Sequence, residues 1–147
     1  MLISREMVLD QDIGLNGTLF GGDMMARMDM VAGITASLMS RNRRFVTLKV
    51  SELIFHSPVR PGEIIEFYAT VVRQGRTSLT IQIEVQVYAP VTDTHRDVTS
   101  GEFVMVGVDA AGQAEPILWK EEMIQEANAL HQRRKARQDE PGRKNQG

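Results

Sequence analysis

The chain contains no cysteine at all. This absence excludes a disulfide framework, a thiolate nucleophile and a thiolate metal site. Aromatic residues are scarce, at 5% of the chain, and charge of neither sign dominates, with 19 acidic residues against 17 basic ones. A balanced charge argues against a chain-wide electrostatic surface for nucleic acid. We therefore expect no nucleic-acid partner, and the absence of cysteine fits a reducing compartment.

Long hydrophobic runs are also missing. No segment approaches the roughly 18 consecutive apolar residues that a membrane-spanning helix needs. The sequence reaches Arg5 and Glu6 within a few residues of its start, so it lacks the apolar run of a signal peptide. These features predict a cytoplasmic protein with no membrane partner. The length of 147 residues suits one domain with a core of its own.

A helical pattern is the first positive signal along the chain. Apolar residues recur at helical spacing from about Gly22 to Met39, and they cover most of the helix circumference. A helix that is apolar on so many sides is usually buried. Before it, residues 10–22 are dense in Gly, Asp and Asn and predict a loop, and residues 2–9 predict a short strand.

Strand signals dominate the rest of the domain. Segments rich in β-branched and aromatic residues, divided by turn signals, predict antiparallel strands at 45–55, 63–73, 77–88 and 102–108. The polar stretch 90–101 is interpreted as a connection. Residues 118–138 predict a peripheral helix, and 139–147 predict a disordered tail. A sheet that wraps one long helix satisfies this order, so we expect an α+β domain over residues 1–117.

Four motifs follow one another along this domain: NGTLFGGDMMARMD at 16–29, RFVTLKVSELIFHSPVRPGE at 44–63, GRTSLTIQIEV at 75–85 and FVMVGVDAAGQ at 103–113. In this order they resemble the hotdog-fold acyl-CoA thioesterases, specifically the bacterial YciA type that is related to the animal cytosolic acyl-CoA hydrolases. The resemblance covers about residues 2–117. It implies the hotdog fold, a curved antiparallel sheet around one helix.

The resemblance also implies an assembly and a reaction. Two subunits of a homodimer would join their sheets edge to edge, with active sites at the interface, and further assembly would give a tetramer or hexamer. The implied reaction hydrolyses an acyl-CoA to CoA and a free carboxylic acid. No cofactor is expected, because CoA is part of the substrate.

Asp29 is the central catalytic candidate. On helical spacing it shares a face with Met25, Ala32, Gly33 and Ala36. A carboxylate among apolar or small side chains is expensive to bury, so it is paired, exposed or functional. Partial burial would raise its pKa and make it a better base. The alternative is that it faces solvent or caps a loop. The resemblance implies a general base acting on water, or a nucleophile that forms an anhydride.

Gly21 and Gly22 precede the predicted helix. Free backbone N–H groups at a helix N-terminus, helped by the helix dipole, can stabilise the oxyanion that develops on a thioester carbonyl. Glycine also lets a substrate approach the backbone closely. We predict that the amide of Gly22 or a neighbour forms the oxyanion hole. An ordinary loop-to-helix turn explains the two glycines about equally well.

Asn16 and Thr18 lie in the loop before these glycines. The resemblance implies an Asn or Asp at the position of Thr18, where it helps to position water or the thioester. Thr18 keeps a hydroxyl but lacks the amide or carboxylate. The work of that group could therefore shift to Asn16. The alternative is that Asn16 and Gly17 only form a turn.

Two basic segments are candidates for CoA binding. The turn at 75–78 consists of Gly75, Arg76, Thr77 and Ser78, and the resemblance implies contact with the CoA phosphates or the pantetheine arm. An arginine fork with hydroxyl and amide donors suits phosphate, although Gly-Arg in a hairpin turn is ordinary. The run RNRR at 41–44 could meet the 3′-phosphate, although a charge run is more often a solvated turn.

Histidines give no sign of a metal site. His56, His95 and His131 are scattered, none lies on the predicted catalytic helix, and no pair has metal-ligand spacing. We therefore predict no metal, and we disfavour a dehydratase, since hotdog dehydratases generally pair a histidine with the helix carboxylate. Two other functions stay open beside hydrolysis: a catalytically weak acyl-CoA-binding regulator and an oligomeric scaffold.

Overall fold

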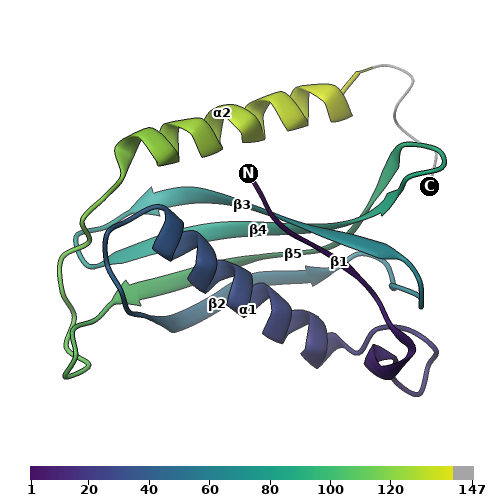
Figure 1. Ribbon diagram of the computed structural model, residues 1–147, viewed down its shortest axis with the longest axis horizontal. Coiled ribbons are helices and arrows are strands. Elements are labelled where there is room, and N and C mark those ends of the chain that lie inside the picture. The colour runs from purple at the N-terminus through teal and green to yellow at the C-terminus, as the bar shows by residue number, and fades with distance from the viewer. Residues whose placement is uncertain (141–147) are drawn as a thin grey trace.

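Five antiparallel strands and two long helices make up the described part of the computed structural model, residues 1–140. The elements are β1 (Leu2–Met7), the short 3₁₀ helix η1 (Asp10–Asp12), α1 (Gly21–Leu38), β2 (Phe45–Phe55), β3 (Ile64–Gln74), β4 (Ser78–Ala89), β5 (Thr94–Gly107) and α2 (Glu121–Gln138). The strand order is β1–β3–β4–β5–β2, which leaves β1 and β2 at the two edges. The two helices lie on opposite faces of this sheet (Figure 1).

The core lies between α1 and the inner face of the sheet. Strand β4 alternates in burial, whereas β3 is buried along most of its length, and the side chains of Ile83 and Phe67 on these two strands are fully buried. Met28 and Ala32 on α1 are equally buried against them. Each large apolar side chain buried in this way stabilises the fold by about 1.5–3 kcal/mol. The packing confirms the predicted α+β hotdog architecture and fixes α1 rigidly across the sheet.

Strand β5 differs from the prediction. It begins at Thr94, whereas the sequence predicted a polar connection over 90–101 and a strand only over 102–108. That prediction is wrong because the polar side chains of this half-strand are hydrogen-bonded on the outer face of the sheet. His95 Nε2, for example, lies 2.8 Å from Oε1 of Glu66 on β3. The β4–β5 connection is instead a tight turn directly before Thr94.

The two helices also refine the predicted boundaries. Helix α1 matches its predicted range within one residue, and α2 begins at Glu121 instead of residue 118. Most of the predicted disordered tail, 139–147, lies outside the described residues. The expectation that α1 is buried on most sides is wrong for the single chain, because Met30 and Ile34 are 69% and 43% exposed. An apolar stripe therefore faces outward along the helix.

Candidate active site

The N-terminus of α1 presents backbone amides without helical partners. Phe20 is the N-cap, and the first helical bond runs from the Met24 amide to the Phe20 carbonyl at 3.1 Å. The amides of Gly21, Gly22 and Asp23 precede it and have no carbonyl four residues back within the helix. A Cβ at Gly22 would lie 2.9 Å from Cε1 of the exposed Phe20 ring, so a side chain at this position would displace that ring. The positive end of the helix dipole is thus open to a ligand.

Asp29 lies on the same face of α1, two turns further along. Its side chain is exposed in the single chain, whereas the sequence suggested partial burial. Its Oδ1 accepts a hydrogen bond from the Thr47 hydroxyl on β2 at 2.5 Å. Gly22 and Asp29 are seven residues apart, which places them on one side of the helix about 10 Å apart along the axis.

Exposed apolar side chains lie along α1 and along the edge strand next to it. On α1 they include Met25 and Met30, and on the adjoining edge strand β2 they include Leu48 and Phe55, which are 69% and 55% exposed. Within the described residues, β2 pairs with β5 on one side only, so its other edge carries unpaired backbone groups. Long apolar edge strands are normally covered or paired with another chain. These properties are those of a subunit interface.

The loop before α1 carries Asn16 at the tip of a turn. The amide of Gly14 donates to the Thr18 carbonyl at 2.9 Å, and Gly17 has a φ of 74°, a conformation that favours glycine. Within residues 1–140, the Asn16 and Thr18 side chains make no hydrogen bond. The loop adjoins the helix N-terminus, where the Leu19 amide donates to the Val59 carbonyl at 2.8 Å.

Arg27 fastens this loop to the helix. Its guanidinium pairs with Asp12 of η1 at 3.1 Å and also with Glu6 at the end of β1. Both ion pairs are partly buried. The path of the chain into the first turn of α1 is therefore held by charge as well as by backbone bonds.

The hairpin turn at 75–78 lies near the C-terminal end of α1, far from the helix N-terminus. It is closed by the Gly75 amide, which donates to the Ser78 carbonyl at 2.8 Å, and the Arg76 carbonyl accepts from Ile117 at 2.9 Å. The basic run 41–44 flanks the same backbone segment, because the Arg41 amide donates to Leu118 at 2.9 Å. The chain thus brings the two basic segments together and keeps both away from its own Gly22.

The guanidinium groups of this basic end are all exposed: Arg41, Arg43, Arg44 and Arg76. None of the four forms an ion pair with a carboxylate of residues 1–140. An unpaired arginine cluster is suited to a phosphate-bearing ligand.

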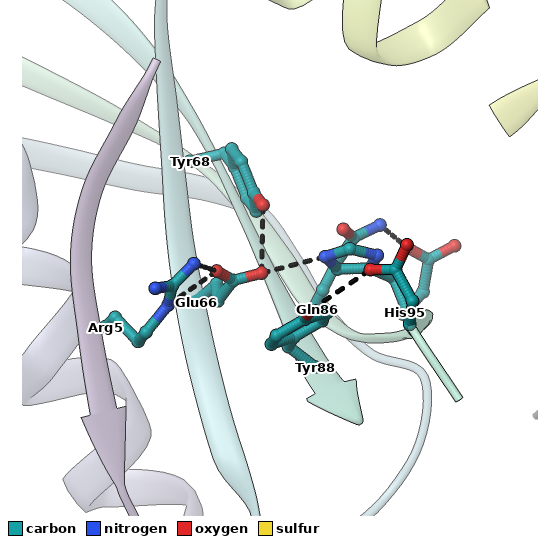
Figure 2. A network of polar contacts seen from close by, with 8 residues as sticks. Arg5, Glu66, Tyr68, Gln86, Tyr88 and His95 are labelled. Atoms are coloured by element: carbon teal, nitrogen blue, oxygen red, sulfur yellow. Dashed lines mark hydrogen bonds and ion pairs between the residues drawn. The ribbon is translucent and has the colours of Figure 1, made fainter. Parts of the chain in front are cut away.

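A second polar centre lies on the outer face of the sheet, where Glu66 is buried (Figure 2). Arg5 donates to its Oε2 at 2.8 and 2.5 Å, and Tyr68 and His95 lie 3.0 and 2.8 Å from its Oε1. Burial acts to raise the pKa of Glu66, but these hydrogen bonds outweigh it and hold the pKa below its usual value. Burial, together with the Glu66 charge, raises the pKa of Tyr68 to about 12.

Thr47 is the site residue that sequence reasoning missed. Threonine is common in strands, and its contact with Asp29 depends on how the edge strand crosses α1. The register of β2 against β5 shifts between Thr47 and Lys49, and an alternation of polar and apolar residues in the sequence does not predict such a shift.

Within residues 1–140, no cluster of three or more His, Asp or Glu side chains is arranged to hold a metal ion. No helix in that range is both long and apolar enough to cross a membrane.

Comparison with known proteins identifies the family of the chain. The family model of the thioesterase superfamily matches residues 16–89. The acyl-CoA thioester hydrolase YciA of Salmonella typhimurium is 33% identical over 120 residues, covering 79% of this chain and 89% of that protein. The Escherichia coli protein of the same name is 34% identical over 116 residues, covering 76% of this chain and 86% of that protein.

Solved structures are similar over most of the chain. A hexameric broad-specificity acyl-coenzyme A thioesterase matches with a TM-score of 0.80 and 28% identity, covering 90% of this chain and 98% of that one. The hexameric thioesterase of Yersinia pestis matches with a TM-score of 0.74 and 32% identity, covering 80% and 94%. The chain belongs to the thioesterase superfamily.

Proposed function

We propose that the protein hydrolyses acyl-CoA thioesters to CoA and a free carboxylic acid. The observation that carries the proposal is the position of Asp29. Its carboxylate is exposed at the centre of an apolar stripe that also presents the unpaired amides around Gly22. The names of the relatives and of the solved thioesterases support the same reaction class.

The proposed site needs two copies of the chain. A reacting carbonyl must lie within about 3 Å of its oxyanion donors and close to the attacking group. Within one chain, Gly22 and Asp29 are separated by about 10 Å along the helix, so they cannot serve the same carbonyl. A second copy packed antiparallel on the exposed face of α1 would bring its Gly22 to this Asp29. Two-fold symmetry then gives two identical sites.

The edge strand supports the same assembly. In the proposed dimer, β2 of each copy pairs with the other, which satisfies the open backbone groups and covers the exposed apolar residues. The hexameric state named for the solved relatives leads us to propose further assembly of such dimers. The dimer remains the smallest unit with a complete site.

The proposed chemistry uses few groups. Thr47 donates to Oδ1 of Asp29, which leaves Oδ2 free to accept a proton from water. The water oxygen bonds to the thioester carbonyl carbon, and the resulting oxyanion is held by the helix amides of the other copy. Collapse of this intermediate breaks the C–S bond and releases the CoA thiolate, which takes up a proton. Direct attack by Asp29 through an anhydride uses the same geometry.

The exposed arginines at 41–44 and Arg76 complete the proposal. CoA carries phosphate groups, and guanidinium forks bind phosphate in bidentate fashion. Because neighbouring carboxylates within residues 1–140 do not neutralise these arginines, they are available to the nucleotide part of the substrate. The hydroxyls of Thr77 and Ser78 are placed in the same turn.

Mixing two inactive variants tests the shared site. Asp29→Asn removes the carboxylate, and Gly22→Val displaces the Phe20 ring and blocks the amides. Each variant alone is expected to be nearly inactive on a panel of acyl-CoAs. Coexpressed with different tags, they form mixed dimers in which one site carries both changes and the other is intact. Random mixing then restores about a quarter of the wild-type activity.

A matched control and a binding measurement complete the test. Coexpression of Asp29→Asn with Asp29→Ala leaves no intact site and is expected to stay inactive. If the Gly22→Val mixture is equally inactive although mixed dimers are recovered, the site is not shared and the proposal is wrong. Calorimetric binding of acyl-CoA to the wild type without turnover would instead favour an acyl-CoA-binding regulator.

A further inference from the structure

Two opposite charges lie on the open edge strand β2. Lys49 and Glu52 are the only charged residues of this strand, and both side chains are exposed. Glu102 on β5 lies diagonally across from Lys49, but no ion pair joins them. Within residues 1–140, neither Lys49 nor Glu52 forms an ion pair. A strand edge with one unpaired charge of each sign is suited to antiparallel pairing with a second copy of itself.

The backbone of Glu52 has a conformation that glycine adopts more easily. Its φ is 51°, in the left-handed region where other residues are uncommon. Glu52 lies in a β-bulge, because the register of β2 against β5 shifts between Ser51 and Ile54. Strained positions of this kind persist where the side chain or the local bend serves a function. The bulge therefore indicates a role for this glutamate that the single chain does not show.

The proposed shared site locates the two-fold axis of the dimer. Gly22 of one copy faces Asp29 of the other, so the axis passes midway between these two residues of α1. Two contacts relate this part of the helix to β2. Thr47 donates to Asp29 at 2.5 Å, and a Cβ built on Gly21 would lie 3.6 Å from the Phe55 ring. The stretch of β2 between these contacts therefore lies alongside the part of α1 that the axis crosses.

The middle of that stretch is Ser51, so two copies of β2 related by the axis cross close to this residue. Ser51 then lies opposite Ser51 of the other copy, and Lys49 lies within one position of the other copy's Glu52. Opposite residues of antiparallel strands are roughly 5 Å apart, and one further position adds about 3.4 Å. The long side chains of lysine and glutamate span such a separation.

We propose that Lys49 of each copy forms an ion pair with Glu52 of the other, and that these two symmetric pairs fix the register of the dimer. The inference rests on the proposed function, because the shared site locates the axis. A slip to the next register with the same faces moves one strand by two residues, about 7 Å. Gly22 would then lie far from Asp29 of the other copy, although a displacement of about 1 Å already slows catalysis strongly. Lys49 and Glu52 are therefore positioning residues.

Charge reversals on separate chains test the ion pair. Lys49→Glu brings two glutamates together at each pair, and Glu52→Lys brings two lysines together. Each variant alone should have a dimer Kd at least about tenfold above that of the wild type in sedimentation experiments, and little activity at low protein concentration. Coexpressed with different tags, each variant meets the opposite charge in its partner. Mixed dimers should exceed the proportion of about one half that random mixing gives, and they should recover the wild-type kcat.

The double variant Lys49→Glu/Glu52→Lys should assemble and turn over like the wild type. An ion pair within one chain would also be restored in this variant, but it would not be restored in the mixture. If the double variant recovers and the mixed dimers do not, the inference is wrong. Wild-type assembly by both single reversals also overturns it. Glu126→Lys, at an exposed position of α2, is the matched control and should leave assembly unchanged.

The count of mixed dimers by native mass spectrometry needs no substrate. If a single reversal yields no soluble protein, the coexpressed variants decide: soluble mixed dimers support the inference, and insoluble ones overturn it. If the wild type hydrolyses no acyl-CoA, the thioesterase proposal fails, and the count still tests the ion pair. If the wild type is active and the mixed dimers occur in the random proportion, the ion pair is wrong while the thioesterase proposal stands.

Discussion

Asp29 and Glu66 are carboxylates on opposite sides of one sheet, and they differ in burial and in the number of hydrogen bonds that they accept. Glu66 is 1% exposed and accepts hydrogen bonds from Arg5 and Tyr68, with His95 at 2.8 Å. Asp29 is exposed and accepts a hydrogen bond from Thr47. A carboxylate whose oxygens are saturated has no capacity left to accept a proton from a substrate. A carboxylate with a free oxygen, as at Asp29, keeps that capacity.

The contrast extends to the surfaces around them. On the outer face, Glu84 accepts from both Arg134 and Lys135 of α2 at 2.9 Å, and the Arg134 guanidinium lies 4.1 Å from the Tyr68 ring centroid. Burial acts to raise the pKa of Glu84, but these two cations hold it below its usual value. These ion pairs hold α2 against the outer face of the sheet. On the side of α1 that carries Asp29, by contrast, exposed apolar residues such as Met25 and Met30 remain uncovered in the single chain, as the proposed dimer requires.

The largest expected effect comes from Asp29→Asn. Loss of the carboxylate should lower kcat on the best acyl-CoA at least 100-fold, because a positioned general base contributes that much or more. The melting temperature should change little, since asparagine keeps the shape of the side chain and its Oδ1 can still accept from Thr47. A thiol reagent that reports released CoA gives the rate. A variant with nearly full kcat would remove Asp29 from the chemistry.

The second effect, on stability, comes from Glu66→Gln. Glutamine keeps the shape but brings an NH₂ donor against the surrounding donors and removes the charge, which we expect to lower the free energy of unfolding by about 2 kcal/mol. Activity per folded molecule should be unchanged. Urea unfolding followed by circular dichroism measures the loss, and the kcat of the folded variant is the control.

The pH dependence of that loss sharpens the comparison. The pKa of Glu66 is lowered by folding, so its contribution is complete above the ordinary value of 4.5 and disappears as pH falls through the lower folded value. The stability gap between wild type and Glu66→Gln should therefore narrow in acid. A gap that stays constant from neutral pH to below the folded pKa would contradict this assignment of charge.

The sequence predicts more of the fold than of the candidate site, and particular residues explain why. The apolar periodicity of α1 and the alternation of β4 follow directly from which side chains meet the core. The polar start of β5 escaped prediction because His95 and its neighbours have the composition of a loop, and only Glu66, 29 positions earlier, explains their place in a strand. Hydrogen bonds between distant residues leave no local pattern.

The same limit applies to the candidate site. Asp29 became the catalytic candidate because a carboxylate lies among apolar and small residues on one face of the helix and because the surrounding motif resembles a family. Thr47 carried no signal, since its hydrogen bond to Asp29 depends on where the register of β2 against β5 shifts. That register is a property of packing that appears only when the sheet is assembled.

The smallest expected effect concerns Thr47, which distinguishes Asp29 from a freely rotating surface carboxylate. Thr47→Val keeps the shape of the side chain but removes the donor to Oδ1. We expect kcat to fall about tenfold, the worth of one hydrogen bond to a charged group, with KM nearly unchanged. Thr47→Ser retains the hydroxyl and should recover most of the rate. If Thr47→Val and Thr47→Ser are equally slow, packing of the threonine methyl, and not its hydrogen bond, positions Asp29.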